Sequence, residues 1–161
     1  MSDLKQAIQR EYLKCASDPV HFMRKYCTIQ HPTKGKVKFD LYPYQERCLT
    51  EFKDHRYNII LKARQLGIST LSAGYSLWLM LFHNDKNVLV IATGKDTAKN
   101  LVTKVRVMYE GLPQWLKTNT EEINKLSLRF KNGSQIKAIA SNESAGRSEA
   151  LSLLILDEAA F

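Results

Sequence analysis

Residues 62–70 have the types and the spacing of a phosphate-binding loop. In order they are Lys62, Ala63, Arg64, Gln65, Leu66, Gly67, Ile68, Ser69 and Thr70. The segment fits the pattern G-x-x-x-x-G-K-[ST], with lysine at the position of the first glycine and isoleucine at that of the usual lysine. Gly67 permits close approach of the backbone to an anion, and Ser69 takes the place of the hydroxyl that binds Mg²⁺ in such loops.

A phosphate loop also needs positive charge. The helix expected to begin here directs its free N–H groups and the positive end of its dipole at an anion. Because Ile68 carries no charge, Lys62 or Arg64 must neutralise the β- and γ-phosphates. A strand with a lysine before a glycine turn is also common in other proteins, so this segment alone does not establish phosphate binding.

A pair of adjacent carboxylates, Asp157 and Glu158, follows the apolar residues 153–156 (LLIL). In nucleotide hydrolases an aspartate at this place holds Mg²⁺ through water, and the following glutamate polarises the attacking water. Neighbouring carboxylates repel each other, which favours a cation beside them. A solvated acidic turn explains the pair taken alone. The pair and the loop together predict a site for ATP and Mg²⁺.

The elements that must position these residues alternate between strand and helix. We expect strands at 58–63, 87–92 and 151–156, and helices at 69–83 and 96–109. Residues 126–130 and 135–140 flank an Asn-Gly turn and predict a β-hairpin. Apolar strands separated by helices favour an α/β fold with a mostly parallel sheet that is covered on both faces.

The preceding part of the chain is expected to be mainly helical. A helix at 3–16 would carry an apolar stripe made of Leu4, Ile8, Tyr12 and Cys15. Asp18 and Pro19 then have the types of an N-cap and a first helical residue, and they predict a short helix to about residue 26. A basic, turn-rich connector (30–38) and a helix at about 44–54 follow.

The composition favours a polyanionic partner. The formal net charge is +8 and the isoelectric point is near 9.4. An excess of this size suits nucleic acid, although a solvated basic surface would give the same number. The lysines and arginine at 95, 99, 104 and 106 do not share one helical face, and we interpret them as solvent-exposed rather than as a DNA contact.

Membrane, secretory and disulfide classes are not indicated. No apolar run approaches the roughly 20 residues that span a bilayer, and the first residues lack the apolar core of a secretory signal. Cys15, Cys27 and Cys48 form no CxxC pair, so neither a disulfide framework nor a zinc ribbon is expected. These observations favour a cytosolic protein.

Over nearly its whole length, the chain resembles the N-terminal ATPase region of the large terminase subunit of tailed bacteriophages, the motor that pumps DNA into the procapsid. Residues 64–67 (RQLG) are similar to the terminase phosphate loop, and some members carry the lysine at the head of the loop, as Lys62 does here. Residues 41–45 (LYPYQ) resemble the adenine-binding segment of that family. The resemblance implies that Tyr44 and Gln45 contact adenine, whose N6 and N7 a glutamine amide can pair. An exposed glutamine on a helix is the alternative.

The resemblance also singles out Arg147. Terminases tend to carry an arginine here that is proposed to reach the γ-phosphate of a neighbouring subunit, where such a residue stabilises transition-state charge. This chain has Ser148 where the motif usually has glycine. A solvated loop arginine is the alternative reading.

The family resemblance implies a P-loop NTPase fold of the additional-strand, catalytic-glutamate (ASCE) type. Residues 1–40 would be a helical lead-in, and residues 41–161 the N-terminal part of an ATPase domain without the nuclease domain. The strand expected after the acidic pair would lie beyond Phe161, so we expect a fragment of a longer protein that is marginally stable alone. Implied partners are double-stranded DNA, the portal, the small terminase subunit and further copies in a ring, in the host cytoplasm and without a membrane.

Two other functions remain open from the sequence. Residues 156–159 (LDEA) resemble the DEAD-type box of superfamily 2 helicases, although the Gly-Lys-Thr loop of those enzymes is absent. A non-catalytic nucleic-acid-binding module with a decayed loop would fit the basic charge and Ile68. The acidic pair argues against decay, because unused carboxylates have little reason to end a buried strand.

Overall fold

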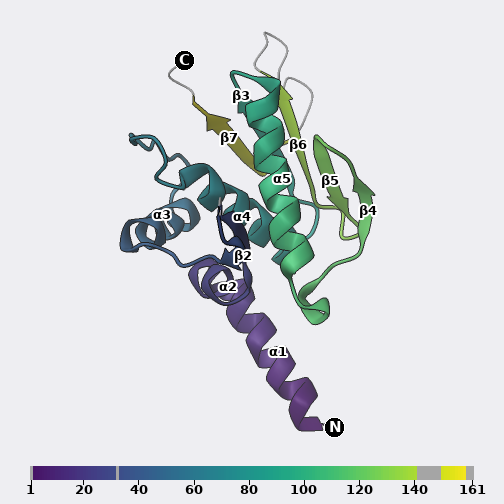
Figure 1. Ribbon diagram of the computed structural model, residues 1–161. Coiled ribbons are helices and arrows are strands. Elements are labelled where there is room, and N and C mark those ends of the chain that lie inside the picture. Colours follow the sequence, from purple (N-terminus) through teal and green to yellow (C-terminus); the bar gives the residue numbers. More distant parts are fainter. Residues whose placement is uncertain (1, 32, 141–149, 159–161) are drawn as a thin grey trace.

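The computed structural model describes residues 2–31, 33–140 and 150–158 (Figure 1). It is a mixed α/β structure with a five-stranded sheet, flanking helices and a separate two-stranded hairpin. The α/β class predicted from the sequence is confirmed. None of the helices in these ranges is both long and apolar enough to cross a membrane.

The main sheet has the strand order β4-β5-β6-β3-β7. Its strands are β3 (Asn87–Ala92), β4 (Thr120–Ile123), β5 (Ser127–Phe130), β6 (Gln135–Ala140) and β7 (Leu153–Asp157). Strands β6, β3 and β7 are parallel, whereas β4 and β5 join antiparallel at one side. The carboxyl ends of the three parallel strands therefore meet at one edge of the sheet.

Helices α4 (Ile68–Phe82) and α5 (Lys95–Gly111) pack against each other, and both contact the sheet (Figure 1). Leu153 and Ile155 of β7 pack toward the core. On the other face of the same strand, Leu154 is 46% exposed and Leu156 is 55% exposed. The prediction of cover on both faces is therefore wrong at β7, as far as the described residues go.

Short-range signals explain why several elements begin where predicted. Asp18 Oδ1 accepts hydrogen bonds from the backbone N–H groups of Val20 (2.8 Å) and His21 (3.2 Å), and Pro19 opens α2 (Pro19–Tyr26). Gly133 has φ +82° in the turn between β5 and β6, a backbone conformation that favours glycine. Helix α3 (Pro43–Asp54) and α4 also form where they were expected.

Two other expectations need correction, and two elements were not expected. The segment 58–63 is not a strand: Ile59 and Leu61 are fully exposed, because no strand of the described residues lies beside them to accept and donate backbone hydrogen bonds. The basic connector is instead a hairpin of β1 (Thr28–His31) and β2 (Gly35–Lys38). The polar strand β4 and the short 3-10 helix Gln114–Leu116 were not anticipated.

Helix α1 (Ser2–Ser17) packs only at its C-terminal end. Leu4 is exposed and Cys15 is buried, so the predicted apolar stripe contacts the core only in its last turns. The indole N–H of Trp78 donates to the carbonyl of Cys15 (2.9 Å) and attaches this end to α4. Phe22 of α2 belongs to the same buried cluster as the sheet residues.

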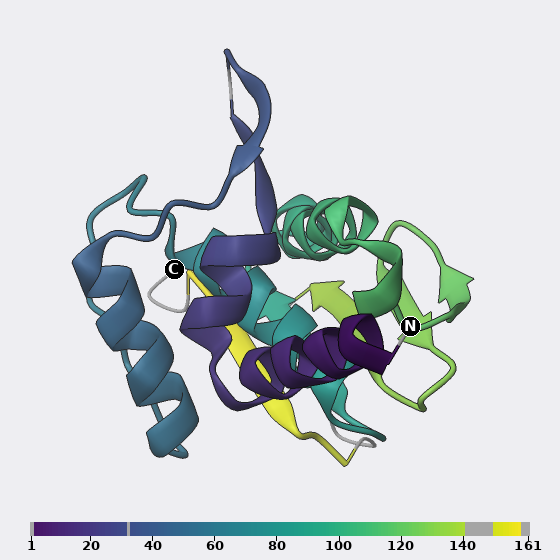
Figure 2. The same cartoon turned by 90° about the horizontal axis from the view of Figure 1, so that it is seen from below.

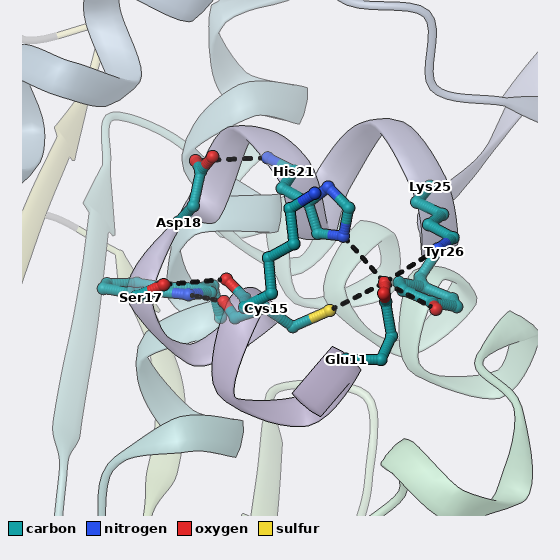
Figure 3. A network of polar contacts seen from close by, with 9 residues as sticks. Glu11, Cys15, Ser17, Asp18, His21, Lys25 and Tyr26 are labelled. Atoms are coloured by element: carbon teal, nitrogen blue, oxygen red, sulfur yellow. Dashed lines mark hydrogen bonds and ion pairs between the residues drawn. The ribbon is translucent and has the colours of Figure 1, made fainter. Parts of the chain in front are cut away.

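A carboxylate network joins α1 to α2 (Figure 3). Glu11 Oε1 lies 2.7 Å from Nε2 of His21, 2.9 Å from Nζ of Lys25, 2.9 Å from the hydroxyl of Tyr26 and 3.9 Å from Sγ of Cys15. Glu11, Cys15 and His21 have the spacing of metal ligands. The Lys25 ammonium already supplies positive charge to the same oxygen, and we interpret the cluster as a structural link. The hydrogen bonds from His21, Lys25 and Tyr26 lower the pKa of Glu11 to about 2, and the bond from His21 has the largest effect.

Candidate functional site

The structure brings the two chemistry-bearing segments together at the carboxyl edge of the parallel strands. Ser69 lies in the first turn of α4, and its hydroxyl donates a 2.8 Å hydrogen bond to Oδ2 of Asp157. Asp157 ends β7 and stands in register with Ala92, the last residue of β3. In open α/β sheets, ligands bind at this edge.

The loop before α4 contains two left-handed residues and leaves the first turn of the helix without a side-chain cap. Gln65 (φ 62°) and Gly67 (φ 70°) both adopt left-handed conformations. Gly67 is the N-cap of α4 and offers no side chain to the N–H groups of the first turn. Because those groups are not capped by a side chain, they remain open to a negatively charged ligand.

Two residues of α3 hold this loop in place. The hydroxyl of Tyr44 (2.8 Å) and Nε2 of Gln45 (3.1 Å) both donate to the carbonyl of Leu66. Gln45 is only 2% exposed, and its Oε1 accepts a 3.1 Å bond from the N–H of Tyr42. The sequence interpretation missed this positioning role of the two residues. Their contact with adenine stays a prediction.

The position of Gly67 favours glycine for two reasons: its left-handed backbone conformation and the short distance to the Gln45 side chain. A Cβ atom at this position would lie 2.8 Å from Nε2 of Gln45, closer than real Cβ contacts. The buried amide therefore packs directly under the loop, and a larger residue at 67 would displace it.

The cations proposed for the phosphates are available. Lys62 and Arg64 are exposed, and neither forms an ion pair with any residue that the structure describes. Ile68, which replaces the usual lysine, is buried in the core. Its side chain therefore belongs to the packing of α4, and the positive charge has to come from elsewhere. Of the remaining loop residues, Ala63 is exposed and Thr70 is half-buried.

Lys104 of α5 is a further cation near this site, and the sequence interpretation placed it on a solvated surface. The residue is half-buried. Burial lowers the pKa of Lys104, the Asp157 carboxylate opposes that change, and Lys62 adds to it. Lys104 is thus within electrostatic reach of both motifs. Sequence spacing could not reveal this, because the position of Lys104 depends on how α5 packs over the sheet.

Glu158 directly follows the aspartate and has an unusual backbone. It is exposed and adopts φ 58°, a left-handed backbone conformation that residues other than glycine, asparagine and aspartate rarely adopt. Such conformations cost free energy and concentrate at functional sites. Arg147, the proposed finger, lies outside the described residues, as does Ser148.

The oxygen atoms at the contact between α4 and β7 suit magnesium. A hydroxyl and a carboxylate are the hard oxygen donors that Mg²⁺ prefers. The Ser69 hydroxyl and the Asp157 carboxylate lie 2.8 Å apart and would offer such oxygens to the ion at one place. These residues therefore fit the ion that the sequence predicted.

No protein-family model matches the chain. Among solved structures, the chain is similar to the crystal structure of the HK97 bacteriophage large terminase, with a TM-score of 0.64, 15% sequence identity and 88% of this chain covered. The match covers 37% of that terminase chain. A likeness at this identity concerns the fold. The chain therefore has a mixed α/β fold similar to that of part of a phage large terminase.

Proposed function

We propose that this chain binds and hydrolyses ATP with Mg²⁺, as the ATPase part of a large terminase subunit that packages double-stranded DNA. The observation that carries the proposal is the hydrogen bond between Ser69 and Asp157. It joins Ser69 and Asp157, which belong to two different sequence motifs and were both assigned to the metal. It also lies where the uncapped N-terminal turn of α4 meets the acidic pair. The terminase-like fold supports the same proposal.

Each residue has a distinct role in this proposal. The N–H groups of the first turn of α4 bind the phosphates, and Lys62 with Arg64 neutralises their charge. Ser69 and Asp157 hold Mg²⁺, which when bound withdraws charge from the phosphate oxygens. Glu158 orients a water molecule for in-line attack on the γ-phosphate.

The base of the nucleotide is assigned to the start of α3. Tyr42 is exposed and stacks on Tyr44, with ring centroids 5.6 Å apart and planes 7° from parallel. The Gln45 amide has two N–H donors, and the Leu66 carbonyl accepts one. We assign the other donor to adenine; because Gln45 is 2% exposed here, this contact requires the loop above the amide to move when the nucleotide binds.

The remaining parts of the proposal rest on the terminase resemblance. Arg147 would act on the nucleotide of a neighbouring subunit in a ring. The portal and the small terminase subunit would be the protein partners, in the cytoplasm of the host. The chain spans 37% of the terminase that it resembles, so these assignments concern a larger assembly.

Glu158→Gln separates binding from chemistry. We expect this variant to bind Mg²⁺-ATP as the parent does and to lose ATP hydrolysis, because the amide keeps the shape but not the charge that polarises water. Lys131→Gln, an exposed lysine in the β5–β6 turn, is the matched control and should leave both unchanged. Hydrolysis at the parental rate in Glu158→Gln would remove the glutamate from the mechanism. Absence of nucleotide binding by the folded parent would contradict the proposed function.

A further inference from the structure

The β1–β2 hairpin projects away from the rest of the molecule (Figure 2). Its strands pair Thr28 with Lys38, Ile29 with Val37 and Gln30 with Lys36. The hairpin forms a sheet of its own and is not joined to the main sheet. It is therefore a two-stranded ribbon on which Gln30, Lys36 and Lys38 are exposed and the other strand residues are half-buried.

The base of the ribbon is anchored to the body. Strand β1 packs against α5, and Ile29 packs against the buried core. A Cβ at Gly111, the last residue of α5, would lie 2.5 Å from Oγ1 of Thr28, which shows how closely the two elements approach. The N–H of Phe39 donates to the carbonyl of Cys27 (3.0 Å) and closes the base. The base of the ribbon is therefore held against α5.

The ribbon carries three lysines, and the acidic residues next to it in the sequence, Asp18 and Asp40, lie outside the hairpin. Lys36 and Lys38 are exposed on the same face as Gln30, and Lys34 is exposed in the turn. Residues 19–39 contain no aspartate or glutamate. None of the three lysines forms an ion pair with a residue that the structure describes.

The cations just before the ribbon are arranged differently. Arg24 pairs with Glu46, and Lys25 pairs with Glu11 at 2.9 Å. The two cations of α2 are thus paired within the chain, whereas Lys34, Lys36 and Lys38 have no such ion pair among the described residues.

We propose that the β1–β2 hairpin binds the phosphate backbone of double-stranded DNA through Lys34, Lys36 and Lys38, without reading the base sequence. The proposal rests on the proposed function for the nature of the polyanion, and on the hairpin itself for the place of contact. Lysine ammonium groups act as point charges toward phosphates. Residues two apart on a strand lie about 6.6 Å apart, so the lysines can reach separate phosphates.

The shape and composition of the ribbon favour duplex DNA over other partners. The major groove of B-DNA admits a two-stranded β-ribbon, whereas that of duplex RNA is too narrow for side chains. Single-stranded nucleic acid is usually bound by stacking on aromatic side chains, and residues 28–38 contain no phenylalanine, tyrosine or tryptophan. Protein interfaces are depleted in lysine, which is the main residue type on this face.

The test compares two triple variants of the whole chain that lose the same charge. One carries Lys34→Gln, Lys36→Gln and Lys38→Gln. The other carries Lys5→Gln, Lys125→Gln and Lys131→Gln, exposed lysines on α1 and around β5. Fluorescence anisotropy measures binding of a random-sequence DNA duplex at several salt concentrations. Calorimetry measures Mg²⁺-ATP binding by the same samples, and thermal melts verify that they are folded.

We expect the hairpin variant to bind DNA at least about tenfold more weakly at 0.1 M salt. The logarithm of the association constant for DNA falls linearly with the logarithm of the salt concentration. We expect the hairpin variant to have a slope smaller in magnitude by about 2–3, because each lost phosphate contact reduces that magnitude by roughly 0.9. The control variant should stay near the parent, and a variant with arginine at all three hairpin positions should retain binding. Mg²⁺-ATP binding should be the same in all four proteins.

Equal loss in both triple variants would overturn the proposal and assign DNA binding to general surface charge. Failure of the folded parent to bind duplex DNA while Mg²⁺-ATP binding is intact would overturn it and leave the nucleotide site standing. A third outcome would also overturn the proposal: the parent binds polyglutamate but not DNA, and the hairpin variant loses polyglutamate binding. This result would indicate an acidic protein partner.

Discussion

The hydroxyl of Ser69 and the carboxylate of Asp157 are 2.8 Å apart, although 88 positions separate them in the sequence. The bond connects the first turn of α4 to the carboxyl end of β7. It therefore joins the helix end to which we assign the phosphates to the carboxylates to which we assign the metal and the attacking water. The proposed nucleotide site depends on this single junction between helix and sheet.

Replacing Ser69 by alanine should weaken Mg²⁺-dependent ATP binding about 10–100-fold. The variant loses an oxygen ligand and a hydrogen bond to a carboxylate, an interaction worth about 1.5–3 kcal/mol. Titration of ATP with and without Mg²⁺ measures the effect. Ser69→Thr keeps the hydroxyl and should bind nearly as the parent does. Equal weakening in both variants would show that packing, and not the oxygen, matters at this position.

Gly67→Ala should destabilise the protein more than Gly35→Ala. Both glycines have φ +70°, so each alanine pays roughly 1–2 kcal/mol for the left-handed backbone. Only at Gly67 does the new Cβ meet Nε2 of Gln45, whereas nothing lies within 4 Å at Gly35. Displacing the buried amide should cost about 1–3 kcal/mol more. Urea unfolding measures both, and equal losses would contradict the close packing under the loop.

Stability should fall in acid because of Glu11. Its pKa is lowered from 4.5 to about 2 by hydrogen bonds to His21 and Lys25. A carboxyl whose folded pKa lies below its unfolded value stabilises the protein above the unfolded pKa. That contribution should be present above about pH 4.5 and lost as the pH falls toward 2.

Glu11→Gln is the control for this pH dependence. It should cost about 1–3 kcal/mol near pH 7, since it leaves His21 and Lys25 without their charged partner. Its unfolding midpoint in urea should then vary less between pH 5 and 2 than that of the parent. An unchanged pH profile in Glu11→Gln would assign the acid sensitivity to other carboxylates.

Lys104→Ala should weaken ATP binding by about threefold to tenfold. The residue is half-buried within electrostatic reach of Lys62 and Asp157, and the loss of such a charge is worth roughly 1 kcal/mol. Lys104→Arg keeps the charge and should bind nearly as the parent does. A smaller Kd for ATP in Lys104→Ala would indicate that this lysine opposes the binding of the metal instead.

The sequence predicted what depends on neighbours along the chain. Asp18 and Pro19 identify the start of α2, and Asn132 with Gly133 identifies the β5–β6 turn, because caps and turns are set by a few adjacent residues. The apolar residues of β3 and α4 were recognised from their pattern, since both elements are buried.

The proximity of Ser69 and Asp157 was expected from their two motifs, but several other features that depend on distant contacts were not predicted. The segment 58–63 has the composition of a strand, but a strand also needs a partner, and none lies beside it in the described part of the chain. The β1–β2 hairpin was not recognised, because the lysines of β2 give it the composition of a loop. Its two strands pair only with each other and not with the main sheet. The burial of Gln45 under the loop and the approach of Lys104 to Asp157 both arise from the packing of α3 and α5.

Calorimetric titration of Mg²⁺-ATP into the parent, Lys62→Ala and Lys131→Ala tests the central claim most directly. The account predicts binding by the parent and by Lys131→Ala, and loss of binding in Lys62→Ala, because the lysine at the head of the loop replaces the one that Ile68 displaced. Equal binding by all three folded proteins would contradict this assignment of the phosphate site. No binding by any of them would contradict the site itself.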